Sequence, residues 1–388
     1  MNPLQNLNVV IVSHIATSGP AHDLRDYLIP KVKRLIFIGH PLLFLPSTRK
    51  SRSCCEKYVN GKRTKLRRAP LFKGPELLLY LKDCLYSFFW VLLSGKKYDL
   101  WIGLGNINAW MGWFLKKIGV VRRVIFFSID YVPVRFTNQW VNRFYHWIDG
   151  WVYRSCDFTW NLSERMIEAR EKIGLCREVK HKVVPHGVHF ERIQRLPFEK
   201  IHRNEIVFMG TLLEKQGIQY LIRALPLVRD VISEVTLTVI GAGPYEKDLK
   251  KLVQSLNLND QIHFLGYIEN HQELENILCQ GALAIALYET RDGNFSYYAD
   301  PGKLKNYLAA GLPVLMTDVP SIAQEMVRNH CGMIVSLNSP DIAQAVIHLL
   351  KSDETLKGYR RNAIQFASQY EWSEVFKKAF ESCFKENI

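Results

Sequence analysis

The sequence lacks the features that mark several large classes of protein. No long apolar run is present, because the most hydrophobic stretch, 77–93, is interrupted by Lys82 and Asp83. Its uninterrupted part, 84–93, is well short of the roughly 20 residues that a membrane-spanning helix needs. Residues 1–8 are polar, and the apolar run after them is too short for the core of a secretory signal. The sequence therefore predicts a cytoplasmic protein without a membrane span.

Patterns that bind metals or dinucleotides are also absent. The eight cysteines form no Cys-x-x-Cys pair and no Cys/His cluster with the spacing of a zinc site. The motif Asp-x-Asp does not occur, and the turn Gly241-x-Gly243 is followed by Glu246 where a dinucleotide fingerprint needs a third glycine. We therefore expect neither a metal nor a nicotinamide cofactor.

Acidic residues are few in the first half of the 388-residue chain. Residues 1–200 contain 33 Lys and Arg against 15 Asp and Glu, whereas 201–388 contain 18 against 22, within a net charge of +14. A basic half joined to a mildly acidic half indicates two domains with different partners. The basic half suits anionic lipid head groups, nucleic acid or a phosphorylated ligand. With 48% hydrophobic residues, the chain has enough apolar material for sizeable cores, which excludes disorder.

Short apolar runs alternate with helical patterns along the chain, which is typical of βαβ units and parallel sheets. In the first half we predict strands at 9–13, 34–38, 99–103, 124–127, 156–160 and 183–185, and helices at 21–29, 75–93, 107–118 and 138–153. In the second half we predict strands at 205–209, 235–240, 262–265, 282–287 and 314–317, and helices at 218–228, 246–256, 272–279, 302–310, 321–327 and 340–351, with a last helix after about 372.

This pattern predicts an α/β fold with two doubly wound, Rossmann-like domains. The domains are expected at 1–190 and 205–368, joined by a linker at 191–204 and followed by a C-terminal helix within 369–388. Two such domains that face each other leave a central cleft at the carboxyl ends of their strands, where helix N-termini favour anions. The architecture therefore indicates a phosphate-bearing ligand.

Two segments of the first half have two interpretations each. The run 49–73 is expected as a mobile, solvated loop, or as a groove for an anionic partner. Its ten basic residues are Arg49, Lys50, Arg52, Lys57, Lys62, Arg63, Lys65, Arg67, Arg68 and Lys73. The aromatic stretch 75–93 is expected as a largely buried helix, or as an interfacial helix that lies on a bilayer.

The most informative stretch is 297–314, which reads YYADPGKLKNYLAAGLPV. Asp300 is placed to cap a helix, and the proline after it suits the first helical position. Gly302 lets a ligand approach the backbone, and the first-turn N–H groups of Gly302, Lys303 and Leu304 would face an anion, to which Lys303 adds a full charge. The stretch predicts a phosphate-binding helix N-terminus; the alternative is an ordinary capped helix whose lysines face solvent.

On these residues the second half resembles the donor-binding domain of GT-B glycosyltransferases, specifically of glycosyltransferase family 4. Members often carry a Lys followed by Glu-Tyr-Leu-Ala-Ala-Gly-x-Pro-Val, and this chain has Lys303 followed by NYLAAGLPV at 306–314. Three further stretches, 208–218, 239–244 and 263–268, are similar in order and spacing to the family's diphosphate loop, its second strand turn and the segment beside the nucleotide base. Donor-binding residues implied by the resemblance are Gly210, Thr211, Lys215, Gly241, Tyr267, Tyr298, Gly302, Lys303, Leu304 and Asn306.

The resemblance covers 205–388 and is weak over the first 200 residues. Residues 370–373 resemble the segment that opens the C-terminal helix, which in this fold crosses back to the N-terminal domain. The helix within 369–388 is therefore expected to do the same.

The sequence departs from the family at three positions. The family's two glutamates, separated by seven residues, are replaced by Tyr298 and Asn306. Asn306 can still hydrogen-bond a ribose hydroxyl, and Asp300 is a candidate catalytic residue in place of the first carboxylate. Thr211 stands where an arginine often follows the glycine, which leaves Lys215 and Lys303 as the cations of the site. Two cations and helix amides could stabilise a departing nucleoside diphosphate without a metal.

Candidates in the N-terminal half lie after predicted strands. Gly19 and His22 follow the first strand and are candidates on the acceptor side, although a surface or structural role for the histidine is an open alternative. Asp130 stands where the family often presents a His toward the transferred sugar, so it could hydrogen-bond a sugar hydroxyl or act as a base. The alternatives for Asp130 are a helix cap or an ion pair with Arg135, itself an acceptor-side candidate.

The resemblance implies a retaining, metal-independent transferase of the hexosyltransferase type. Its donor would be a nucleotide sugar, with uridine diphosphate sugars the first expectation and guanosine diphosphate mannose the second. Its acceptor would be a saccharide or a lipid-linked saccharide, as in capsule, exopolysaccharide or other surface polysaccharide assembly. The basic half and stretch 75–93 suggest peripheral association with the anionic inner face of the cytoplasmic membrane.

Three alternatives remain open at this point. Loss of both motif glutamates allows a catalytically inactive, transferase-like scaffold. A nucleotide-sugar epimerase of the same fold is a second alternative. A nucleic-acid-binding protein would explain the charge but not the stretch 297–314, and because no nucleic-acid module is evident, no nucleic-acid partner is expected.

Overall fold

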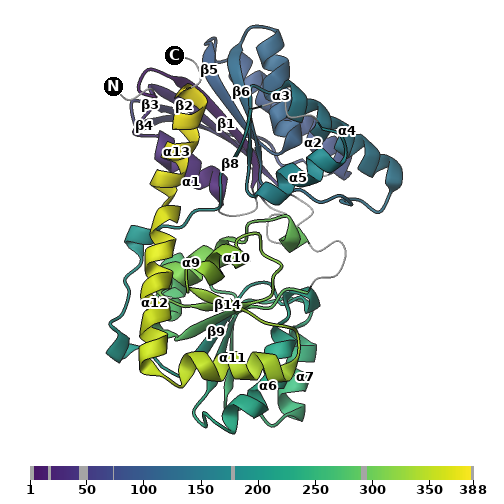
Figure 1. Ribbon diagram of the computed structural model, residues 1–388. Helices are drawn as coiled ribbons and strands as arrows, with labels where there is room; N and C mark the ends of the chain where they lie inside the picture. The colour runs from purple at the N-terminus through teal and green to yellow at the C-terminus, as the bar shows by residue number, and fades with distance from the viewer. Residues whose placement is uncertain are drawn as a thin grey trace. The chain divides into compact units, whose positions relative to one another are not determined.

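The computed structural model describes residues 4–15, 19–42, 51–72, 74–175, 180–289 and 295–385. The chain divides into two compact units: the first is Met1–Pro185 with Trp372–Ile388, and the second is His186–Glu371. Each unit contains one β-sheet and the helices packed on it (Figure 1). The predicted fold class, two doubly wound α/β domains, is confirmed.

The sheet of the first unit has the strand order β4-β3-β2-β1-β5-β6-β7-β8. In the run β2-β1-β5-β6-β7-β8, each strand is parallel to its neighbours. The strand β3 pairs antiparallel with both β2 and β4. The order reverses between β1 and β5, and ligands of doubly wound sheets bind at such a point. The strands are β1 (Asn8–Ile15), β2 (Arg34–Pro41), β3 (Cys54–Val59), β4 (Lys62–Arg68), β5 (Tyr98–Leu104), β6 (Val121–Ser128), β7 (Phe158–Asn161) and β8 (Lys180–Val183).

Helices cover both faces of this sheet because its central strands are apolar on both sides. Val10 and Val12 of β1 pack into a core with α2, α3 and α4, whereas Phe37 of β2 faces His22 of α1 on the other side. The helix α13 packs beside α1 (Figure 1). The helices are α1 (Pro20–Leu28), α2 (Glu76–Leu92), α3 (Asn106–Lys117), α4 (Gln139–Ser155), α5 (Glu164–Lys172) and α13 (Trp372–Lys385).

The basic run 49–73 is not a loop over its described part, so that prediction was wrong. Residues 51–72 contain the antiparallel hairpin β3–β4, which extends the sheet beyond β2. Its turn is Asn60-Gly61, with φ of 47° and 80°, and Asn-Gly at two positive φ values is the preferred two-residue hairpin turn. Arg49, Lys50 and Lys73 lie outside the described residues.

The sheet of the second unit is parallel throughout, in the order β11-β10-β9-β12-β13-β14. Ile206 and Phe208 of β9 pack into one core and Val207 into the opposite one, as strand alternation requires. The order reverses between β9 and β12. The strands are β9 (Glu205–Met209), β10 (Thr236–Ile240), β11 (Ile262–Gly266), β12 (Leu283–Ala286), β13 (Val314–Met316) and β14 (Gly332–Ile334).

The helices of the second unit include one that the sequence analysis missed, α12, along with the short strand β14. The stretch predicted as a linker, 191–204, is part of this unit, because Ile193 and Ile201 are buried in its cores. The α-helices are α6 (Ile218–Arg229), α7 (Glu246–Ser255), α8 (His271–Gln280), α9 (Gly302–Ala310), α10 (Ala323–Arg328), α11 (Ser339–Leu350) and α12 (Asp353–Ala367), and the short 3-10 helices are η2 (Phe190–Arg192), η3 (Phe198–Lys200), η4 (Glu214–Gln216), η5 (Phe295–Tyr297) and η6 (Ser368–Tyr370).

The predicted C-terminal helix is α13, which belongs to the first unit although α12, just before it, belongs to the second. The chain thus passes between the units twice, after Pro185 and after Glu371. The two passages lie side by side, because Val188 pairs with Glu371 and its N–H donates to the Tyr370 carbonyl at 2.8 Å. No helix in the described part of the chain is both long enough and apolar enough to span a bilayer.

Candidate functional site

The start of α9 and the end of β9 are fixed together in the second unit. Tyr307, buried in α9, accepts the Met209 N–H at 2.6 Å through its hydroxyl oxygen and donates to the Met209 carbonyl at 3.2 Å. This holds α9 beside the strand that borders the reversal in strand order, where a parallel sheet binds its ligands. The helix α9 of the stretch 297–314 thus lies at the edge of the sheet where the strand order reverses.

Lys303 lies in the first turn of α9 and points toward the loop after β9. Its Nζ donates to Gln216 Oε1 at 2.8 Å, and an added Cβ on Gly210 would be 3.4 Å from that Nζ. The ammonium also lies over two aromatic rings, 4.9 Å from the centroid of Phe208 and 4.6 Å from that of Tyr288. The neighbours of Lys303 are thus the Gln216 amide, two aromatic rings and the backbone of Gly210.

The charge on Lys303 is weaker than the sequence predicted. Desolvation by burial lowers the pKa of Lys303 to about 7, so the side chain is only partly protonated at neutral pH. No carboxylate contacts Lys303 among the described residues, and an arriving anion would favour the protonated form. The arrangement suits an anion that binds together with a proton.

Asp300 does not cap α9, which corrects the sequence analysis. The N-cap is Pro301, and α9 begins at Gly302. The Asp300 carboxylate is buried; it accepts the His186 N–H at 2.7 Å and forms an ion pair with Lys305, which is itself fully buried. Asp300 thus ties the segment before α9 to the start of the unit.

Two of the three predicted amide donors remain at the amino end of α9. The Leu304 N–H donates to the Pro301 carbonyl at 3.1 Å, so it is not available to a ligand as predicted. The N–H groups of Gly302 and Lys303 have no backbone acceptor within the described residues. At Gly302 an added Cβ would be 2.6 Å from His186 Cε1, so a side chain there would require the His186 ring to move.

The loop after β9 packs closely against the end of β12. Gly217, with φ of 77°, approaches so closely that an added Cβ would be 1.6 Å from the Leu287 carbonyl oxygen. The Glu289 N–H donates to the carbonyl of Lys215 at 3.1 Å. This places Lys215 and the exposed Thr211 on the loop between β9 and α6, at the reversal in strand order.

The other predicted donor residues lie at the same edge of the sheet or in α9. Gly241 follows β10, and its N–H donates to the Gly266 carbonyl at 2.7 Å; Tyr267, just after β11, is largely exposed. Asn306 is half-buried one turn after Lys303 on α9, and Tyr298, also half-buried, precedes the helix. The structure thus brings Gly210, Gln216 and Lys303 together and places the remaining residues on neighbouring segments.

Glu289 is a site residue that the sequence analysis missed. It lies just after β12 and is buried, and its Oε1 accepts from the Tyr220 hydroxyl at 2.9 Å and from Gln219 Nε2 at 3.4 Å. The sequence signal was available, since a lone acidic residue follows the apolar run 282–287 at a strand's carboxyl end.

A buried polar network lies at the carboxyl ends of β1 and β2 in the first unit, and it was also missed. Asp83 of α2 faces the sheet, where its Oδ2 is 3.3 Å from His14 Nε2 and its Oδ1 is 3.1 Å from His40 Nδ1. Ser53 donates to the same carboxylate at 3.1 Å, and His40 Nε2 is 2.8 Å from Ser87 Oγ. The negative charge that interrupts the apolar stretch 77–93 therefore points inward.

Charge and burial oppose each other in this network. Burial alone would raise the pKa of Asp83, but the hydrogen bonds from His14 and His40 outweigh it and hold that pKa far below its usual range. Burial lowers the pKa of His40, against the opposing effect of Asp83, so His40 is neutral at neutral pH. Asn108 Nδ2 donates to His14 Nδ1 at 3.1 Å, so both ring nitrogens of His14 have partners.

The predicted acceptor-side residues of α1 lie where the helix meets the sheet. Gly19 is the N-cap of α1, and its carbonyl accepts the His22 N–H at 2.8 Å. The His22 ring packs on Phe37 at 5.5 Å, and desolvation, followed by the charge of Arg25, lowers the pKa of His22. His22 is thus packed against β2 through its ring.

Asp130 and Arg135 pair with each other in the loop between β6 and α4. The Arg135 Nη1 donates to Asp130 Oδ2 at 2.5 Å, and the guanidinium lies 5.1 Å from the centroid of the Tyr145 ring. The Asp130 side chain is more than half exposed. Of the alternatives for Asp130, the ion pair with Arg135 is the one that the structure contains.

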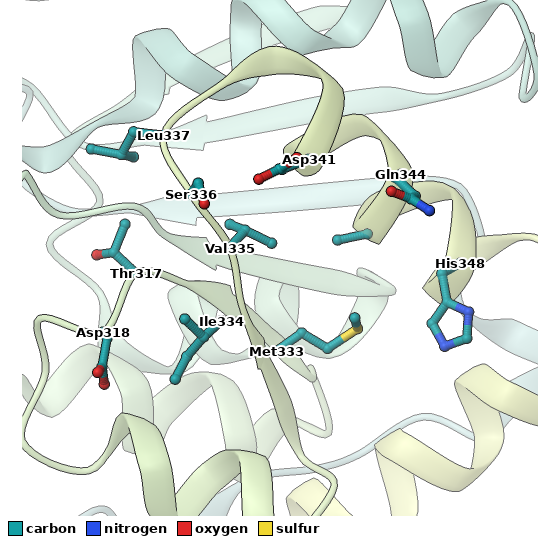
Figure 2. A pocket seen from close by; sticks show the side chains of 11 residues that line it. Thr317, Asp318, Met333, Ile334, Val335, Ser336, Leu337, Asp341, Gln344 and His348 are labelled. Atoms are coloured by element: carbon teal, nitrogen blue, oxygen red, sulfur yellow. The ribbon is translucent and has the colours of Figure 1, made fainter.

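A separate cavity of about 700 Å³ lies at the edge of the second sheet (Figure 2). It is formed where β13 and β14 end beside α11, and Thr317 and Asp318 border it opposite Asp341. The Thr317 hydroxyl is already bonded to the Tyr288 carbonyl at 2.8 Å. None of the predicted donor residues lines this cavity.

No group of three His, Cys, Asp or Glu side chains that could hold a metal ion occurs in the part of the chain that the structure describes. The candidate site of the second unit therefore consists of Lys303, Gln216, the two α9 amides and the glycine-bearing loops at the strand ends.

Two Rossmann-like units with reversed strand orders, the second ending in a helix that returns to the first, define the GT-B fold. Residues 203–352, which lie within the second unit, match the family model described as glycosyl transferases group 1. The resemblance found in the sequence is thus confirmed.

Individual relatives and solved structures match this chain at low sequence identity. A protein of Escherichia coli K12, WcaL, provisionally named a colanic acid biosynthesis glycosyltransferase, is 23% identical over 228 residues, which are 58% of this chain and 54% of that protein. The GDP-mannose-dependent phosphatidylinositol monomannoside mannosyltransferase of Mycobacterium tuberculosis CDC 1551 is 26% identical over 149 residues, 38% of each chain. Anabaena HepE, solved with UDP and glucose, superposes with a TM-score of 0.69 at 15% identity, covering 99% of this chain and 100% of its own.

The chain spans about half the length of the first curated relatives it matches, 54% and 47%. The structural likeness to HepE shows that this chain has the same fold.

Proposed function

We propose that this protein transfers a sugar from a nucleotide-diphosphate donor to an acceptor hydroxyl. The observation that carries the proposal is the Lys303 cluster: a cation with a lowered pKa, the Gln216 amide and two α9 amides at the strand-order reversal of a group 1 domain. Such a cluster binds a diphosphate and stabilises it as a leaving group, because it supplies charge exactly where negative charge develops.

Each named residue has a role in the proposal. Lys303 and the N–H groups of α9 hold the diphosphate, with Lys215, Gly210 and Thr211 on the facing loop. Asn306 hydrogen-bonds the ribose, and Gly241 and Tyr267 border the base. Asp300 fixes the start of α9 through its buried contacts with His186 and Lys305.

The stereochemistry proposed is retention without a metal. The bond between the anomeric carbon and the diphosphate oxygen breaks as the bond to the acceptor oxygen forms on the same face, and the acceptor proton passes to the leaving diphosphate. Asp130 enters the proposal as a sugar-hydroxyl ligand or base that would first have to leave Arg135. Gly19, His22 and Arg135 remain acceptor-side candidates in the first unit.

The donor proposed first is a uridine diphosphate sugar, and the second is guanosine diphosphate mannose. HepE, a protein of the same fold, was solved with UDP and glucose, and the mycobacterial relative is named for GDP-mannose. The acceptor proposed is a saccharide or lipid-linked saccharide of surface polysaccharide assembly, reached at the inner face of the cytoplasmic membrane.

The first experiment is thermal unfolding of the full chain with UDP, GDP and ADP. A specific nucleotide at a hundredfold excess over its Kd should stabilise the fold by about 2.7 kcal/mol. Lys303→Met should abolish the shift, whereas Lys247→Met, at an exposed position of α7, should retain it. If no nucleoside diphosphate stabilises the wild-type protein, the proposal is wrong.

A second experiment separates transfer from its alternatives. Donor and a saccharide acceptor are incubated with the protein, and the anomeric configuration of the product is read by NMR. Conversion of the donor without acceptor would identify an epimerase. Nucleotide binding without any turnover across a donor panel would identify a scaffold, which the replacement of both motif glutamates by Tyr298 and Asn306 makes the main alternative.

A further inference from the structure

The outer side of α2, α3 and α4 carries an unusual number of exposed apolar side chains. On α2 they recur along one stripe, and on α4 Trp140, Phe144 and Trp147 recur at helical spacing, with Trp140 77% and Trp147 60% exposed. We call this surface the three-helix face; its exposed apolar residues are Leu77, Leu78, Leu81, Leu85, Phe89, Leu92, Phe114, Trp140, Val141, Phe144 and Trp147.

The three stripes form one continuous surface. The ring centroids of Phe88 of α2 and Phe114 of α3 are 6.0 Å apart, and those of Trp113 of α3 and Trp151 of α4 are 4.5 Å apart. Trp147 lies 5.5 Å from Trp151. Ring contacts therefore link α2 to α3 and α3 to α4. Monomeric soluble proteins rarely expose large contiguous apolar patches, and such a patch marks a binding surface for a protein or a membrane.

The described charged side chains that lie over the aromatic rings of α3 and α4 on this face are basic. The described carboxylates of the three helices, Asp83 and Asp149, are both buried and point into the unit. Lys117 Nζ lies 5.4 Å from the centroid of the Trp113 ring, and the Arg143 guanidinium lies 5.5 Å from that of Trp140. Exposed Lys96 and Lys97 follow the end of α2. Apolar and aromatic side chains with Lys and Arg beside them match an anionic bilayer surface.

The inward sides of the helices explain why the sequence pattern was ambiguous. Asp83 and Ser87 of α2 face the sheet and are satisfied by the buried network, while the leucines of the same helix face outward. The prediction that 75–93 is largely buried holds for Trp90 and Val91, which pack into the core, but is wrong for the leucines that face outward. A second copy of the chain would have to bring the basic borders of two faces together, so self-association is disfavoured by charge.

We infer that the three-helix face is a docking surface for an anionic lipid bilayer, with α4 contributing as much as α2. The side chains of Trp140, Phe144 and Trp147 enter the acyl boundary, and Lys117 and Arg143 remain at the phosphates. The inference concerns a surface of the first unit and does not depend on the Lys303 cluster. It gives the proposed lipid-linked acceptor a route to the protein that requires no membrane span.

Vesicle flotation of the full-length protein tests the inference. Vesicles of phosphatidylglycerol and phosphatidylcholine in equal parts should bind the protein, and vesicles of phosphatidylcholine alone should bind it at least about tenfold more weakly. Trp140→Ser with Phe144→Ser should weaken binding to the anionic vesicles by about tenfold or more. The matched control, Leu227→Ser with Val231→Ser, removes two exposed apolar side chains from the second unit and should bind as the wild type does.

A charge pair of variants completes the test. Lys117→Glu with Arg143→Glu should weaken binding by more than about fivefold per residue, whereas Lys200→Glu with Lys247→Glu in the second unit should not. The inference is overturned if wild-type protein does not float with anionic vesicles, or if binding is lost only in variants of the β3–β4 hairpin. It is also overturned if light scattering shows a dimer that the Trp140/Phe144 variant dissociates.

Failure of this inference is distinguishable from failure of the proposed function. The face variants keep the second unit intact, so nucleoside diphosphates should stabilise them as they do the wild type. A protein that binds nucleotide but no vesicle contradicts only the docking surface, and one that binds vesicles but no nucleotide contradicts only the transferase proposal.

Discussion

At the scale of single residues, Lys303 titrates differently in the folded and the unfolded protein. Burial lowers its pKa to about 7, so the folded protein has released a proton that the unfolded chain keeps up to about pH 10.4. The unfolded state binds more protons across that window, and this residue therefore makes stability rise with pH there. A diphosphate bound beside Lys303 would favour its ammonium form, so the complex would hold this proton more tightly than the free protein does.

We expect nucleoside diphosphate binding at about pH 8 to take up a proton, and the affinity to fall as the pH rises above about 7. Isothermal titration calorimetry in buffers of different ionisation enthalpy measures the uptake. Lys303→Arg, which stays charged, should bind without uptake. Equal uptake by both proteins would show that another group titrates.

Arg170 is the second residue with a large expected effect. It is fully buried and donates to Asp149 at 2.8 and 2.9 Å, to Asn161 at 2.8 Å and to Ser128 at 2.8 Å. Arg170→Met leaves a buried carboxylate without its partner and should cost about 3–5 kcal/mol in urea unfolding. Arg170→Met with Asp149→Leu should recover much of that loss. A double variant that is less stable than the single one would contradict this account.

The candidate site was only partly predictable at this scale. Gly302 and Lys303 could be placed because capping and turn rules act between neighbours in sequence. The partners of Asp300 could not, since the His186 N–H lies 114 residues away and Lys305 was interpreted as solvent-facing or left without a role. The neighbours that lower the pKa of Lys303 come from β9 and the segment after β12, which only the folded sheet brings together.

At the scale of elements, α2 is attached to the sheet by polar contacts. Asp83 and Ser87 of α2 contact His40 of β2, whose pKa is lowered by burial. Because the unfolded chain protonates its histidines near pH 6.5 and buried His40 does not, the fold loses stability as the pH falls below about 6.5.

We expect His40→Gln to be less stable than the wild type at neutral pH and to show a flatter dependence of unfolding free energy below about pH 6.5. The matched control is His348→Gln, at an exposed position of α11. Urea unfolding at a series of pH values measures both. An unchanged slope in His40→Gln would mean that another group carries the dependence.

Parallel strands and their helices were predictable because apolar runs and helical periodicity are local patterns. The β3–β4 hairpin was missed because its strands are rich in Lys and Arg, which is typical of a solvated loop, although Asn60-Gly61 is a hairpin-turn signal. The exposed side of α2 was misjudged for a different reason. The helix α2 is apolar on both sides, with Trp90 and Val91 in the core and Leu81 and Leu85 exposed, and periodicity alone does not tell which side is buried.

At the scale of the whole molecule, α13 completes the first unit. Phe380 contacts Trp160 at 5.1 Å and stacks with Tyr27 at 6.1 Å, and Trp160 Nε1 donates to Cys383 Sγ at 3.4 Å. All of these partners lie in the first unit. The C-terminal helix is thus part of that unit's core.

We expect Phe380→Ala to cost about 3–5 kcal/mol and to raise hydrogen exchange throughout the first unit while leaving His186–Glu371 protected. Phe366→Ala, in the buried face of α12, should give the opposite pattern. Exchange measured by mass spectrometry distinguishes the two. Equal exposure of both units in both variants would mean that they unfold as one.

The return of α13 also sets an order of events during synthesis. The second unit is continuous in sequence and can fold as soon as residue 371 has left the ribosome, whereas the first, although synthesised earlier, must wait for the helix that begins at Trp372. A nascent chain that has not yet released α13 would carry a folded second unit and a first unit in which Trp160 is still uncovered. Chaperones that scan newly made chains would therefore find their target in the part that was translated first.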